Sequence, residues 1–243
     1  MSNSKAESTP LIPEIDIELI KTLYQQAHTA LIGVVATSVG VAIIFYNNIP
    51  DLTLIAWLTS ILLLSLIRLI SIKKFKRLEQ QAIDATHWGG LFSLFTFLSG
   101  LTWGAASIFF YTPENLQLFN ILTLIIIAMS VGSLAALSAY PKSYYFFLAP
   151  AMLPMILIYL SIDQRGYMIF GALLFVFNYA LISIVKVNNK LLRDSILLRY
   201  ENSALVSQLT EEKERAEQAS CSKTKFLAAA SHDLRQPLHA IGL

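Results

Sequence analysis

Residues 117–139 run QLFNILTLIIIAMSVGSLAALSA, a stretch without one charged side chain. A helix needs about 20 apolar residues to cross the ~30 Å hydrocarbon core of a bilayer. Backbone polar groups have no water to bond to in lipid, and a helix satisfies them internally. The stretch therefore predicts a transmembrane helix.

Further stretches of this kind occur on both sides of it. Together the apolar stretches lie at 29–48, 52–72, 88–111, 117–139, 144–162 and 167–187. Turn-forming residues separate them, for example NNIPD at 47–51 and TPEN at 112–115. The sequence predicts an all-α protein with a six-helix transmembrane bundle.

The composition supports a membrane protein with polar flanking segments. Hydrophobic residues make up 55% of the 243 residues and charged ones 14%, whereas soluble domains carry about 25% charged residues. The net charge of +2 is too small to indicate a nucleic-acid partner.

Basic residues predict the orientation of the bundle, because they favour cytoplasmic loops. With the N-terminus inside, only Arg165 of the 18 basic residues lies outside. We therefore expect a multi-pass protein of the cell inner membrane with both termini in the cytoplasm. We also expect Arg68 to extend toward the basic loop that contains Lys73 and Lys74, which leaves no acid or base at mid-membrane depth.

The N-terminal segment, residues 1–28, is predicted to be a cytoplasmic tail. Its apolar residues Ile15, Leu19, Ile20 and Leu23 fall close together if the segment is helical. Two interpretations stay open here. Residues 14–27 form either a short amphipathic helix on the cytoplasmic surface or a plain helical extension of the first span.

Residues 188–222 change to a charged segment with a heptad pattern. Leu191, Leu198, Leu205 and Leu209 repeat with this spacing, and Ser195 and Asn202 occupy intervening core positions. Polar residues at core positions fix the register of a coiled coil. We expect a continuous helix that leaves the sixth span and pairs with a second copy, giving a homodimer. The alternative is a single amphipathic helix that lies on its own membrane domain.

The residues around His232 form the one motif that indicates chemistry. As a helix, 223–243 places Leu227, Leu234 and Ile241 on one apolar stripe. His232 lies two residues from Leu234, about 200° around the helix, and therefore faces away from that stripe. Pro237 has no N–H to donate, so the helix should bend one turn after the histidine.

The stretch Phe226–Leu238, with its core SHDLRQPL, resembles the H-box of sensor histidine kinases. The resemblance implies that His232 is the phosphoacceptor and that Asp233 assists proton transfer or orients the imidazole. Gln236 stands at the position where the family usually has Thr or Asn to direct water in dephosphorylation, so phosphatase activity is left open. The six-span region resembles the membrane sensor regions of such kinases more loosely.

The resemblance also assigns domains and partners. It implies a sensor domain at 29–187, a signalling helix at 188–222 and the first part of a dimerisation and phosphoacceptor domain at 223–243. The implied partners are ATP with Mg²⁺, bound by a domain outside these residues, and a response regulator or fused receiver domain. We expect the chain alone to be inactive as a protein-histidine kinase, and no metal site is predicted in it.

Several features within the spans could serve sensing of a small molecule or of membrane lipid. Gly100 and Gly104 form a GxxxG pattern, for which packing inside the bundle is favoured over a dimer contact. Pro150 and Pro154 should kink the fifth span. Polar or amphipathic groups within spans should bond between helices; they are Asn120, Asn178, Trp57, Trp103 and Tyr179.

The remaining histidines, His28, His87 and His239, are interpreted as solvated or interfacial residues. A different class of function is also kept open: a small polytopic transporter or membrane scaffold with a cytoplasmic helical tail. The H-box and the expected lack of charge at mid-membrane depth disfavour it.

Overall fold

The computed structural model describes residues 11–78 and 84–241, with only the backbone described at 11–13 and 226–241. The described chain is helical throughout. Its helices are α1 (Leu11–Phe45), α2 (Asp51–Lys76), α3 (Ala85–Phe109), α4 (Leu116–Leu137), α5 (Pro141–Ser161) and α6 (Arg165–Ile241).

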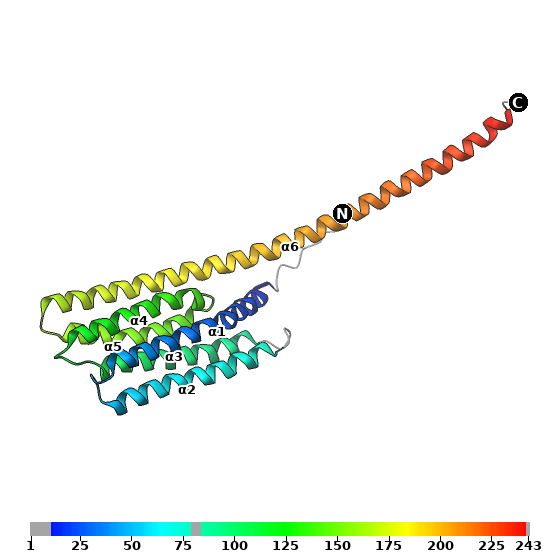
Figure 1. Ribbon diagram of the computed structural model, residues 1–243. Coiled ribbons are helices and arrows are strands. Elements are labelled where there is room, and N and C mark those ends of the chain that lie inside the picture. The colour runs from blue at the N-terminus through cyan, green and yellow to red at the C-terminus, as the bar shows by residue number, and fades with distance from the viewer. Residues whose placement is uncertain (1–10, 79–83, 242–243) are drawn as a thin grey trace. The chain divides into compact units, whose positions relative to one another are not determined.

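Each of the six helices is long and apolar enough to cross a membrane, which confirms the predicted spans and the all-α class. The structure divides into two compact units, Met1–Asp194 and Ser195–Leu243, and α6 contributes to both. In the first unit α1 to α5 and the start of α6 lie side by side as a bundle (Figure 1).

Helix ends fall at the predicted breaks for identifiable reasons. After α1, Asn47 adopts a φ of 63°, a left-handed conformation that asparagine tolerates at helix ends. Before α3, the Asp84 carboxylate accepts hydrogen bonds from the backbone N–H groups of Thr86 (2.9 Å) and His87 (3.1 Å). Such a cap satisfies donors that the first helical turn leaves free.

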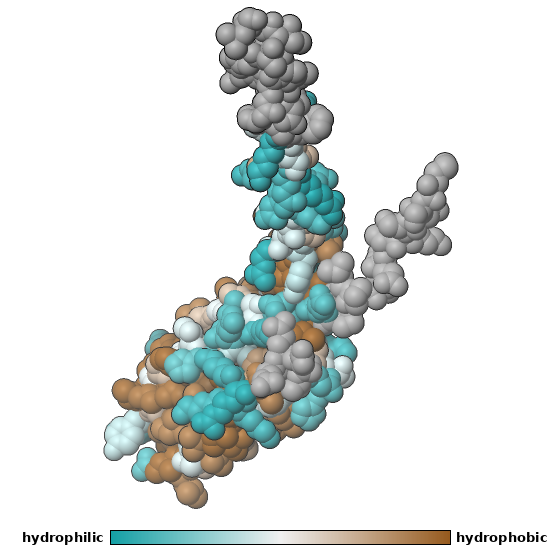
Figure 2. Space-filling model, turned by 90° about the vertical axis from the view of Figure 1, so that its right-hand side faces the viewer, coloured by the Kyte–Doolittle hydropathy of each residue, from teal (hydrophilic) through white to brown (hydrophobic). Residues whose placement is uncertain are grey.

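The outside of the bundle is apolar, as a lipid-facing surface should be. Ile43, Leu124, Leu157 and Phe175 are each more than half exposed. Figure 2 looks onto the bundle end that carries Lys73, Lys74 and Lys76, and polar side chains gather there with apolar ones around the rim. We call this end the basic end.

The N-terminal part of α1 is a continuation of the first span. Helix α1 runs unbroken from Leu11, and Ile15, Leu19, Ile20 and Leu23 are buried. Residues 14–27 are therefore a helical extension of the first span. The interpretation as a separate surface helix is wrong, because this apolar face packs into the bundle rather than onto lipid.

Aromatic rings hold α1, α2 and α3 together at the basic end. The Tyr24 ring stacks on Phe75 with centroids 4.0 Å apart and meets the edges of Trp88 and Phe92. The Tyr24 hydroxyl also donates to the Trp88 carbonyl oxygen at 3.1 Å. The rings thus fix how the three helices meet beneath the loop.

The GxxxG pattern of α3 packs against α5 within the bundle, as predicted. A Cβ added to Gly104 would lie 2.0 Å from the Pro150 carbonyl oxygen, and one added to Gly100 would lie 2.4 Å from the Phe147 carbonyl oxygen. Pro154 has no N–H, so the Pro150 carbonyl lacks its usual helical partner and approaches the glycine backbone. A Cα–H···O contact of this kind is common between closely packed helices.

Candidate functional site

The predicted phosphoacceptor residues lie on the last helix. Backbone helix α6 continues through His232, Asp233 and Gln236 and past Pro237 to Ile241. The side chains of these residues lie outside the described part of the chain. Their chemical roles stay predictions, as does a bend at the proline.

A row of leucines on α6 is exposed, with no covering partner among the residues that the structure describes. Leu191, Leu198, Leu205 and Leu209 are each 55–66% exposed. Further along the same helix, Arg215 donates to the Glu211 carboxylate one turn before it. At about 1.5–3 kcal/mol per buried leucine, covering this row with a second copy would stabilise the helix. The dimer itself stays a prediction.

Two side chains of α6 attach it to the basic end of the bundle. The Asn189 amide donates to the carbonyl oxygens of Ser138 (2.8 Å) and Ala139 (3.1 Å), directly after α4. One turn later, Arg193 donates to the Asp16 carboxylate of α1 at 2.6 Å. We call Asn189 and Arg193 the α6 clamp. The clamp could not be predicted from the sequence, because nothing local marks which residues of a long polar helix face the bundle.

Hydroxyl and amide groups join α4 to α5 at the opposite end. The Tyr159 hydroxyl donates to the Asn120 side-chain oxygen and lies 2.8 Å from the Thr123 hydroxyl. The predicted bond between helices is thus confirmed for Asn120. It is also confirmed for Trp57, whose indole N–H donates to the Thr102 carbonyl oxygen at 2.9 Å.

The same prediction fails for three residues. Asn178 bonds to the Leu174 carbonyl oxygen within its own helix. Tyr179 is 71% exposed and faces away from the other helices. The Trp103 ring packs edge-on against Trp57, but its buried indole N–H has no partner among the described residues.

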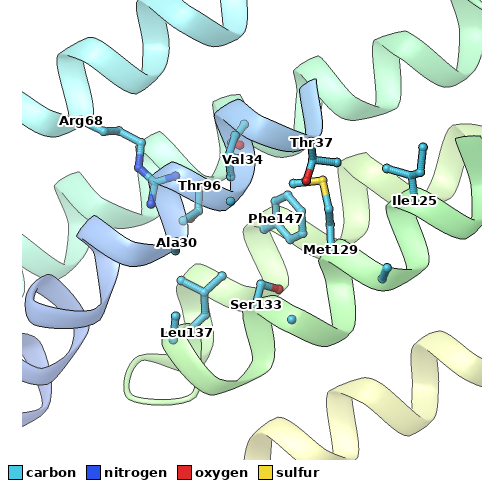
Figure 3. Close-up of a pocket in the computed structure, with 15 residues that line it drawn as sticks. Ala30, Val34, Thr37, Arg68, Thr96, Ile125, Met129, Ser133, Leu137 and Phe147 are labelled. Carbon is cyan, nitrogen blue, oxygen red and sulfur yellow. The ribbon is translucent and has the colours of Figure 1, made fainter. Parts of the chain in front are cut away.

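A cavity of about 400 Å³ lies inside the bundle, beside Arg68. Helices α1 to α5 all contribute to its wall. The residues that define it are Ala30, Gly33, Thr37, Arg68, Thr96, Ser99, Met129, Gly132, Ser133 and Leu137. Figure 3 shows the Arg68 side chain reaching from α2 toward Ala30 and Thr96, while Thr37 and Ile125 lie at the other end. We call this the Arg68 cavity.

The structure corrects the expected position of Arg68. Its side chain does not extend to the loop; the residue is only 8% exposed. The bundle therefore contains an interior charge, which the sequence did not predict. An arginine near the end of a span usually extends to the interface. Here the ring of Phe92, 5.1 Å from the guanidinium carbon, draws the side chain inward.

The Arg68 charge is incompletely compensated. Arginine stays protonated in proteins, and among the described residues no carboxylate pairs with it. Burying an unpaired ion costs several kcal/mol, and a desolvated cation–π contact returns about 2 kcal/mol. The cation–π contact therefore does not offset the cost of burying the charge, and an anion bound beside the guanidinium would reduce that cost.

Comparison of the chain with protein-family models, with curated proteins and with solved structures finds no match.

Proposed function

We propose that the chain is the membrane sensor region of a sensor histidine kinase, with His232 as its phosphoacceptor. The observation that supports this most is the placement of the H-box. The SHDLRQPL motif follows the sixth span on one helix, α6, from Arg165 to Ile241. A change in the bundle would thus reach the histidine without crossing a flexible linker.

The chemistry asked of His232 suits an imidazole near neutral pH. In its neutral form one ring nitrogen is free to attack the γ-phosphorus of ATP. The new N–P bond replaces the P–O bond to ADP, and the proton on the other nitrogen stays or passes to a base. Asp233 would act as a positioning residue, since a nearby carboxylate favours the developing positive charge on the ring.

The proposal requires ATP and Mg²⁺. The resemblance at the H-box assigns their binding to a separate domain and the acceptor role to this chain. A response regulator or fused receiver domain would take the phosphoryl group from His232.

Phosphohistidine mapping tests the proposal. Membranes containing this chain would be incubated with labelled ATP and a histidine-kinase ATP-binding domain, either fused after Leu243 or added separately. We expect acid-labile, base-stable label in the wild type and in His239→Gln, and none in His232→Gln. Asp233→Asn should slow labelling by about 10²–10⁴-fold.

A fusion that labels a known phosphoacceptor helix but not this chain would contradict the proposal. Label that persists in His232→Gln, or that disappears in His239→Gln, would do the same. Insertion of each variant into the membrane is the control for folding.

The transporter alternative gains one observation from the structure. Buried ionisable residues within spans often mark transport pathways, and Arg68 is such a residue. The H-box on α6 still favours the kinase proposal. Loss of labelling in His232→Gln would decide for it, whereas solute uptake by vesicles that depends on Arg68 but not on His232 would decide for transport.

A further inference from the structure

The Arg68 cavity combines one buried positive charge with apolar walls. Among the described residues that line it, Arg68 alone is charged. The lining hydroxyls of Thr96 and Ser133 already donate to the backbone carbonyls of Ser93 and Ser130, each at 2.9 Å. The guanidinium is therefore the strongest donor that the cavity offers to a ligand.

Small residues keep the cavity open between α1 and α4. Gly33 and Gly132 both line it, and a Cβ added to either would meet nothing within 4 Å. Small residues on facing helices normally allow close packing, but here they leave space. Both glycines are exposed on the bundle surface, so a ligand could enter from the lipid.

We infer that the Arg68 cavity binds a single-chain amphiphile with a carboxylate head. The planar guanidinium matches a carboxylate through two parallel hydrogen bonds. From Ile125 to Leu137 the cavity follows α4 for about 18 Å at 1.5 Å per residue, which suits one extended alkyl chain. Its volume of about 400 Å³ falls within the range of about 300–1,000 Å³ typical of small-ligand sites.

The cavity shares its walls with the helices that hold the α6 clamp. Leu137, at one end of the cavity, directly precedes the Ser138 and Ala139 carbonyls that accept from Asn189. Helix α1 forms another wall and carries Asp16, which accepts from Arg193. A ligand that spreads α1 from α4 would move both attachment points of α6. This role as a signal rests on the proposed function, whereas binding itself does not.

Binding can be measured without any phosphoryl transfer. The purified chain in nanodiscs of phosphatidylcholine would be titrated with dodecanoate and with dodecanol, which has the same tail and no charge. We expect dodecanoate to bind about ten- to hundredfold more tightly, the ratio that hydrogen bonds to a charged group confer. Arg68→Gln should remove this preference, and Arg68→Lys should keep part of it.

Gly132→Leu provides a second variant that leaves the arginine in place. Its side chain should fill the cavity without displacing a neighbour and weaken dodecanoate binding by about tenfold or more. Gly40→Leu is the matched control, since a Cβ at Gly40 also meets nothing and Gly40 does not line the cavity.

Equal binding of dodecanoate and dodecanol by the wild type, or no binding of either, would overturn the inference. Unchanged binding in Gly132→Leu would place the ligand elsewhere and overturn it too. Nanodiscs containing phosphatidylglycerol test whether the bound anion is the carboxylate of a single-chain amphiphile or the headgroup of a phospholipid. If that lipid displaces dodecanoate at low mole fraction, the site belongs to a phospholipid and the single-chain assignment is wrong.

Discussion

The Arg193 guanidinium lies 2.6 Å from the Asp16 carboxylate, so two residues 177 positions apart in the sequence meet at the basic end. Both side chains are about two-fifths exposed. An exposed ion pair contributes only about 0–1 kcal/mol to stability. Together with the Asn189 bonds one turn earlier, the pair attaches α6 to the bundle through contacts that are weak enough to be exchanged.

The first prediction concerns this α6 clamp. Asn189→Leu combined with Arg193→Gln should raise amide hydrogen exchange in residues 186–194 by about tenfold, since each lost hydrogen bond is worth about 0.5–1.5 kcal/mol. The melting temperature of the bundle should change little. Lys190→Gln, an exposed neighbour on the same helix, is the control and should leave exchange unchanged. Equal exchange in wild type and double variant would show that the clamp does not hold α6.

The second prediction concerns the glycines of α3. Gly104→Ala should destabilise the bundle by about 1–3 kcal/mol, the usual cost of overpacking, because its Cβ would lie 2.0 Å from the Pro150 carbonyl oxygen. Gly90→Ala in the same helix meets nothing within 4 Å and should leave the melting temperature unchanged or raise it. Thermal unfolding in detergent, followed by size-exclusion chromatography, compares the two. An unaltered melting temperature in Gly104→Ala would contradict the close packing.

The six spans could be predicted because length and hydropathy alone determine them. Their ends agree with the helices to within a few residues, except at the start of α1, which begins at Leu11, and at the end of α6, which continues to Ile241. The polar residues Glu14, Asp16 and Glu18 in its first turns obscured this extension. The sequence groups the apolar residues of this segment on one face, but the bundle contact that buries the face, such as Tyr24 against Phe75 of α2, depends on another helix.

The interior charge could not be predicted, because side-chain direction depends on neighbours from other helices. Five positions before Lys73, Arg68 lies close enough to the loop to extend there. In the bundle, the Phe92 ring on α3 lies beside the guanidinium, and the cavity that Gly33 and Gly132 help to line gives it space. The resemblance at His232 is local to sequence, so it could be recognised there, but its side-chain geometry lies outside the described residues.

The third prediction is the topology. A reporter that is active only in the cytoplasm should be active when fused at Lys76 or after Leu243. A reporter that is active only in the periplasm should be active when fused at Asn115 or Asp163. The physical reason is the excess of lysine and arginine in the loops placed inside. A periplasmic reporter that is active at Lys76 would reverse the orientation and move His232 away from cytoplasmic ATP.

The fourth prediction is that α6 pairs in parallel with its own copy through the leucine row. In the heptad that includes Leu191, Leu198 and Leu205, Ala219 falls on the seam, and Cys221 lies about 200° further around the helix. A disulfide needs Cα atoms about 4.4–6.8 Å apart, which seam positions of a dimer approach and outward positions do not. Ala219→Cys in a Cys221→Ser background should therefore crosslink under mild oxidation, whereas the exposed native Cys221 should not.

Leu198→Asp with Leu205→Asp should abolish the Ala219→Cys crosslink, because two carboxylates at adjacent seam positions repel their copies and remove about 1.5–3 kcal/mol of burial per leucine. Ala204→Asp with Ser207→Asp is the control, since both residues are exposed and lie at the c and f positions of the heptad, which face away from the seam. Strong crosslinking through Cys221 and none through Ala219→Cys would mean that another face of α6 forms the contact. Crosslinking that survives the two aspartates would instead show that the membrane spans hold the dimer, and that the leucine row serves a different partner.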